Sequence, residues 1–90
     1  MGQIPPTMGG TNLDAASAFG AVLRRLRKAV GFTQEQLALE AGLRRTYVSI
    51  LELGQQQPTL TTILKLAAAL GQPAGEIVSL VEAEIARPRK

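Results

Sequence analysis

The sequence predicts an all-α fold, a compact domain of five short helices. Apolar residues recur at the helical spacing of i, i+3, i+4 and i+7 along most of the chain. Glycine and threonine interrupt this pattern where helices should end and begin. Apolar residues make up 46% of the 90 residues but aromatic residues only 3%, which favours an Ala- and Leu-rich helical core over a sheet sandwich.

The first predicted helix begins near Asp14 or Ser17, because either side chain can accept a hydrogen bond from an unpaired backbone N–H. Gly31 ends it. Apolar residues repeat along one face, which should therefore be buried. These residues are Phe19, Val22, Leu23, Leu26 and Val30.

Residues 33–53 predict two further helices joined by a tight turn. Thr33 caps the first of them, and Gln36 completes a capping box three residues later. Gly42 ends that helix, since glycine adopts a positive φ at little cost. The residues expected to be buried are Leu37, Ala38, Ala41, Val48 and Leu51. This is a helix-turn-helix arrangement, whose second helix presents its first residues to base edges in a DNA major groove.

Two more helices complete the predicted domain. Thr59 caps the fourth and Gly71 ends it, after a polar loop over residues 54–58. Pro73 suits the first turn of the fifth. The residues expected to face inward on the fourth helix are Ile63, Leu64, Ala67 and Leu70. On the fifth, Ile77, Leu80 and Val81 lie on one face.

The chain divides into one domain and two short flanking segments. Residues 1–14 should form a flexible arm, rich in glycine and proline and almost uncharged, or a segment foreign to the native protein. Residues 15–86 form the helical domain, and residues 87–90 a basic tail. No stretch is apolar and long enough to span a bilayer, and no signal peptide is recognisable.

The charge is unevenly distributed, although the net charge is only +3. Most cations lie in the first half of the domain, and several glutamates lie in the last helix. Those cations are Arg24, Arg25, Arg27, Lys28, Arg44 and Arg45. Such a division is expected of a protein that meets a polyanion on one side, although an ordinary solvated surface accounts for charge alone equally well.

Several segments together resemble the Xre-type helix-turn-helix regulators, which include phage repressors and the controller proteins of restriction–modification systems. The similarity runs from about residue 19 to residue 77 and rests on the combination of segments. They are Leu26-Arg27, Phe32 to Ala38, Ala41-Gly42-Leu43, Leu51 to Gly54, and Pro58-Thr59-Leu60 before Leu66 to Gly71. The run Arg45 to Ser49 is most similar to the controller proteins. The resemblance implies a phage-repressor-like DNA-binding domain.

The resemblance places three residues of the third helix against bases. Arg45 reaches base edges, where arginine can donate two hydrogen bonds to guanine, unless it is merely solvated or touches only phosphate. Thr46 meets a base edge or a thymine methyl group. Ile50, where the family usually has a polar residue, either meets a thymine methyl group or joins Leu39 and Leu53 in an apolar patch for a protein partner.

A second group should contact the DNA backbone. It comprises Thr33, Gln34, Arg44, Tyr47 and Gln57. Gln34 follows the helix cap, where the family places glutamine against phosphate; the alternative is a surface glutamine with no partner. Tyr47 reaches the backbone through its hydroxyl group or packs on the domain surface. The run 55–57 is Gln-Gln-Gln, where many family members carry cations, and this lowers the affinity expected for DNA.

Arg27 and Glu52 form a structural ion pair by the same resemblance, joining the first helix to the third. Nothing in the sequence indicates an enzyme: no histidine or other base accompanies the serines, and no carboxylate pair or Gly-rich phosphate loop is present. With no His and no Cys, the usual zinc site is excluded, and no metal or other cofactor is expected.

These observations predict a cytoplasmic, sequence-specific regulator of transcription that binds double-stranded DNA. Family members usually pair, so a homodimer on a near-palindromic operator is expected, with the third helix of each copy in the major groove. Ile77, Leu80 and Val81 are the predicted dimer interface. The alternative is a protein-interaction module, such as an antitoxin that binds a partner protein as well as DNA.

Overall fold

The computed structural model describes residues 14–87, and within them every regular element is a helix. The helices are α2 (Ala15–Val30), α3 (Gln34–Ala41), α4 (Arg45–Glu52), α5 (Leu60–Leu70) and α6 (Ala74–Ala86). This confirms the predicted all-α class and the order of the five helices. Residues 1–13 of the arm predicted over residues 1–14, and residues 88–90 of the basic tail, lie outside the described residues.

The predicted helix ends are confirmed at most positions. Asp14 caps α2 by accepting a hydrogen bond from the Ser17 N–H at 3.1 Å. Thr59 caps α5 in the same way. Gly31, Gly42 and Gly71 end their helices with positive φ. Pro73 differs from expectation because it is the residue before α6, with extended φ and ψ, and not part of its first turn.

One apolar core lies between the helices. Its fully enclosed large side chains come from all five of them: Val22, Leu23, Leu37, Val48, Leu51, Leu66 and Ile77. Two inward predictions are wrong, since Val30 is 47% exposed and Leu64 is 52% exposed. Val30 is the last residue of α2, past the buried part of that helix. On α5 apolar residues surround the helix, so periodicity alone could not show that Leu66 faces inward and Leu64 outward.

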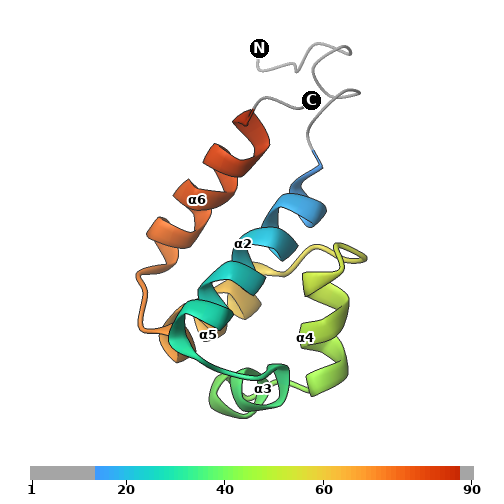
Figure 1. Ribbon diagram of the computed structural model, residues 1–90, viewed down its shortest axis with the longest axis vertical. Coiled ribbons are helices and arrows are strands. Elements are labelled where there is room, and N and C mark those ends of the chain that lie inside the picture. The colour runs from blue at the N-terminus through green and yellow to red at the C-terminus, as the bar shows by residue number, and fades with distance from the viewer. Residues whose placement is uncertain (1–13, 88–90) are drawn as a thin grey trace.

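Helix α2 lies at the centre and contacts α4, α5 and α6 (Figure 1). Helices α3 and α4 pack against each other at one end of the molecule. Gly20 allows α2 to lie very close to the end of α4: a Cβ atom at this position would be 2.5 Å from the Leu51 carbonyl oxygen. The contact fixes α4, and hence its outer face, relative to α2.

Candidate nucleic-acid interface

The α3–turn–α4 unit begins with the predicted capping box. The Thr33 hydroxyl oxygen accepts a hydrogen bond from the Gln36 N–H at 3.0 Å, and the Gln36 side-chain oxygen accepts one from the Thr33 N–H at 2.8 Å. At the other end, Gly42 adopts φ 71°, and the Leu43 N–H then donates to the Ala38 carbonyl at 2.8 Å. These local bonds define where α3 starts and stops, and they set the direction in which the chain enters α4.

Helix α4 has one buried and one outward face. Val48 and Leu51 are buried in the core. Arg45 and Thr46 are exposed, and Ile50 is half-buried. The three residues predicted to contact bases therefore lie on the face turned away from the core, with Ile50 less accessible than the other two. Leu53, just after the helix, is 67% exposed and extends this face.

The predicted Arg27–Glu52 pair is present and partly enclosed. Arg27 Nε donates to Glu52 Oε2 at 2.5 Å, and its Nη2 donates to Oε1 at 3.0 Å. Arg27 also donates to the Phe32 carbonyl at 2.8 Å. Only 4% of the Glu52 side chain is exposed. Hydrogen bonding to Glu52 raises the pKa of Arg27, and the pair ties α2 to α4.

Gln34 belongs to this cluster. Its side-chain nitrogen donates to Glu52 Oε1 at 3.1 Å, which rules out the alternative of a surface glutamine without a partner. The amide group has a second N–H. Gln34 is therefore held at the start of α3, half-buried, beside the outward face of α4.

The cations of the described chain fall into two groups. The side chains of Arg24, Lys28, Arg44, Arg45 and, on α5, Lys65 form no hydrogen bond or ion pair with any residue between 14 and 87. Arg44 directly precedes α4, and its side chain makes no hydrogen bond that caps the helix. Sequence reasoning assigned no contact to Arg24 or Lys28, although their spacing of four residues already placed them on one side of α2.

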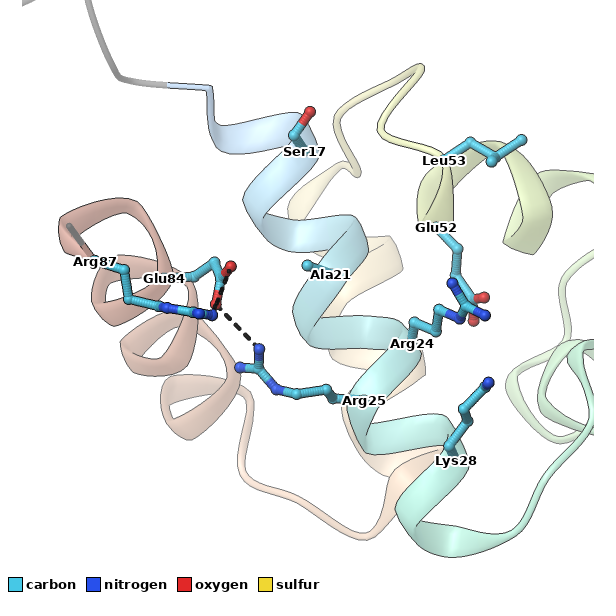
Figure 2. Close-up of a pocket in the computed structure, with 9 residues that line it drawn as sticks. All are labelled: Ser17, Ala21, Arg24, Arg25, Lys28, Glu52, Leu53, Glu84 and Arg87. Atoms are coloured by element: carbon cyan, nitrogen blue, oxygen red, sulfur yellow. Dashed lines mark hydrogen bonds and ion pairs between the residues drawn. The ribbon is translucent and has the colours of Figure 1, made fainter. Parts of the chain in front are cut away.

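Besides Arg27, which pairs with Glu52, two paired cations lie between α2 and α6. Glu84 accepts hydrogen bonds from Arg25 at 3.0 Å and from Arg87 at 3.1 Å (Figure 2). These bonds, first the one from Arg25 and then that from Arg87, lower the pKa of the Glu84 carboxyl group. The side chains of Arg25, Glu84 and Arg87 therefore connect α2 to α6, and their charges are largely paired with one another.

The remaining predicted backbone contacts lie at the edges of the α3–α4 surface. Thr33 is exposed, although its hydroxyl group serves the capping box. Tyr47 is half-buried and packs against the core, which agrees with the alternative of packing on the domain surface. Gln57 is exposed in the loop before α5, where it borders an apolar hollow.

The predicted dimer surface needs a correction. Ile77 is 0% exposed, because it lies inside the core, and so it cannot contact a second copy. Leu80 and Val81 are half-buried and pack against the core. Beside them Val78, which the sequence analysis did not single out, is 44% exposed. It borders an apolar hollow of about 150 Å³ together with Ala15, Phe19, Gln57, Pro58, Ile63 and Val81.

Residues 14–87 contain no cluster of three or more His, Cys, Asp or Glu side chains that could hold a metal ion. Among the same residues, no helix has the length and apolar character needed to cross a membrane.

Comparison with known proteins gives consistent matches. The family model described as helix-turn-helix matches residues 23–77. An HTH-type transcriptional regulator, y4dJ of Sinorhizobium fredii, is 37% identical over 67 residues, which cover 74% of this chain and 87% of that protein. The restriction–modification controller protein C.AhdI from Aeromonas hydrophila is 47% identical, with a TM-score of 0.67 over 69% of this chain and 94% of that one. The controller protein C.Esp1396I, solved as a tetramer with its natural 35-base-pair operator, is 26% identical, with a TM-score of 0.74 over 81% of this chain and 96% of that one.

Proposed function

The chain belongs to the Xre-type helix-turn-helix family of transcriptional regulators, and from this premise we propose that it binds a near-palindromic operator as a homodimer. In this proposal α4 of each copy enters the major groove of double-stranded DNA. The bound protein controls transcription. The proposal further places the protein in the cytoplasm, with its DNA target, and makes it a regulator without catalytic activity.

The outward face of α4 is the observation that supports the proposal best. It presents Arg45 and Thr46 to solvent, beside Arg44, and both arginines are unpaired within the described chain. Adjacent cations at a helix N-terminus are mildly unfavourable because they oppose the helix dipole. An approaching polyanion offsets that cost, and a guanidinium group there can donate two hydrogen bonds to guanine.

Pairing of two copies follows from the small size of the unit. One helix-turn-helix reads only a few base pairs, and a symmetric dimer doubles the site. The apolar hollow beside Val78 and Val81 offers a surface for self-association. The C.Esp1396I tetramer on its operator supports assembly of several copies on one DNA duplex.

Selection of bound sequences from random duplex DNA, with light scattering of the free and bound protein, tests this function. We expect enrichment of one motif with two related half-sites and the mass of a dimer. No enriched motif would overturn sequence-specific binding. A single half-site bound by one copy would overturn the dimer alone.

One observation favours a second function, binding of a partner protein. Leu39, on α3, is 79% exposed and Leu53, just after α4, is 67% exposed, and exposed apolar side chains that gather in one patch mark sites for partner proteins. Leu39→Ser should leave DNA binding intact, because Leu39 does not lie on the outward face of α4, while abolishing association with a protein encoded beside this one. If no association with such a protein is detected, this second function has no support.

A further inference from the structure

A polar crevice lies between α2, the start of α3 and α4. It has a volume of about 270 Å³ and is lined by Arg24, Arg27, Gln34, Ser49, Glu52 and Leu53. Three helices contribute to it, so its shape depends on the packing of the whole domain. Ser49 and Leu53 also belong to the outward face of α4, so the crevice opens beside the residues proposed to read bases.

The acidic charge in this crevice is already neutralised. The Glu52 carboxylate accepts hydrogen bonds from Arg27 and from Gln34. What remains for a ligand is the positive charge of Arg24, which forms no ion pair in residues 14–87. The second N–H of the Gln34 amide and the hydroxyl group of Ser49 add two further donors. The crevice therefore offers one cation and neutral donors, which suits an anion with several oxygen atoms.

A second hollow of about 440 Å³ adjoins the first along α2, since the two share Arg24, Glu52 and Leu53. It adds Lys28, one helical turn beyond Arg24 and also unpaired in the described chain. Figure 2 shows Arg24 and Lys28 extending toward the α4 side of α2, whereas Arg25 points to Glu84 on α6. Four residues of helix separate the two unpaired cations by about 6 Å along the axis, so they can meet neighbouring phosphates.

The family resemblance already places Gln34 against a phosphate of the DNA backbone; we propose that Arg24 and Ser49 bind that phosphate with it in this crevice, and that Lys28 binds the next. The proposal rests on the proposed function and names a further part of the same interface. DNA is favoured over an acidic protein segment because the crevice continues directly into the outward face of α4. The uncharged Gln55–Gln57 run leaves the loop after α4 without cations for this purpose, and α2 supplies them instead.

The salt dependence of DNA affinity measures such contacts. Each phosphate contact contributes about 0.9 to the slope of log affinity against log salt concentration. In a dimer on its operator each substitution removes two contacts, so Arg24→Ala and Lys28→Ala should each reduce the slope by about 1.8, and the double variant by about 3.6. Between 50 and 200 mM salt the affinity of the double variant should therefore fall by a factor about 150-fold smaller than that of the unmodified protein. Base preference should stay unchanged, because phosphates carry no sequence information.

Arg25→Ala is the matched control: Arg25 lies on the same helix and also lines the larger hollow, but its guanidinium group is bound to Glu84 on the α6 side. It should leave the slope unchanged, with circular dichroism confirming the fold of each variant. An equal reduction in Arg25→Ala would show an effect of net charge and overturn the proposal. So would unchanged slopes in Arg24→Ala and Lys28→Ala, the result expected if the crevice takes an acidic protein segment. If the unmodified protein prefers no duplex at all, the proposed function fails first.

Discussion

Among single residues, Arg45 is the one whose loss should most directly change the base preference. It is exposed at the start of α4 and unpaired in the described chain, so its guanidinium group is free to meet a guanine. Arg45→Ala should weaken binding to the preferred duplex by about 1–3 kcal/mol and relax the preference at one base pair of each half-site. Affinities for the preferred duplex and for a set with single-base changes measure both effects.

Gln34→Ala is the comparison for that experiment. Gln34 is expected to donate to phosphate, so its loss should weaken binding to all duplexes about equally. Because Gln34 also donates to Glu52, its variant must be checked for stability. If Arg45→Ala lowers affinity uniformly and retains the base preferences, Arg45 contacts only phosphate and the assignment of α4 as the reading helix is wrong.

The Arg27–Glu52 pair should matter more for stability than for DNA contact. Either side chain left alone would be a nearly enclosed charge without its partner. Arg27→Ala and Glu52→Ala should each lower the free energy of unfolding by about 3–5 kcal/mol. Urea unfolding of both variants and of the double variant measures the coupling between them. Losses that simply add would show that the two side chains do not interact.

At the scale of the helices, Gly20 decides how closely α2 and α4 approach. A methyl group at this position would collide with the carbonyl oxygens of Leu51 and Glu52, at 2.5 and 2.6 Å. These are backbone atoms, so α4 must move as a whole. We expect Gly20→Ala to cost about 1–3 kcal/mol of stability, as overpacking does, and to weaken DNA binding by displacing the reading face.

The matched control is Gly75→Ala. Gly75 also lies in a helix, but a Cβ atom there would meet nothing within 4 Å. Alanine should stabilise that helix by about 0.4–1 kcal/mol through the lower entropy of the unfolded chain. Chemical unfolding of the two variants under the same conditions compares them. Equal stabilisation by both would contradict the close packing of α2 on α4.

The link between α2 and α6 should depend on pH. The bonds from Arg25 and Arg87 lower the pKa of Glu84 in the folded protein. A depressed folded-state pKa contributes stability above the unfolded value, about 4.3 for glutamate, and loses it as pH falls through the folded value. The melting temperature of the unmodified protein should therefore exceed that of Glu84→Gln at pH 7. The two should converge as the pH falls through the folded-state pKa of Glu84, which lies below the unfolded value. A difference that persists once Glu84 is protonated in the folded protein would mean that the carboxylate charge is not the cause.

At the scale of the whole molecule, the surface beside α6 determines whether two copies pair. Val78 is 44% exposed and borders the apolar hollow, so it replaces Ile77 as the residue to test. Val78→Glu should yield monomers at micromolar concentration, measured by light scattering, with helical content unchanged. Leu80→Glu is a less specific test because Leu80 packs against the core.

Ser79→Glu controls for the added charge in that experiment. Ser79 is the exposed neighbour of Val78 on α6 and does not line the apolar hollow. We expect it to remain a dimer. If both variants stay dimeric, the interface lies elsewhere on the domain.

Features that depend on short-range spacing, such as helix caps and the helix-turn-helix pattern, follow from the sequence alone. Capping depends on residues three or four apart, so the Thr33–Gln36 box and the glycines that end α2, α3 and α5 could be read directly. The helix-turn-helix and the residues on the outer face of α4 followed from the same short-range rules. The Arg27–Glu52 pair came from family resemblance, since nothing in helical spacing joins residues 25 positions apart.

The burial of each apolar side chain and the ion pairing of each cation depend on how the helices pack in three dimensions. Ile77 lies in the core and Val78 outside it because α6 turns one particular face toward the rest of the domain. Arg24 and Arg25 are neighbours in sequence with the same chemistry. Their positions around α2 send one toward the crevice beside α4 and the other to Glu84. Periodicity fixes the angle between side chains around one helix. It does not fix how that helix is rotated relative to its neighbours, because this rotation depends on how all the helices pack together.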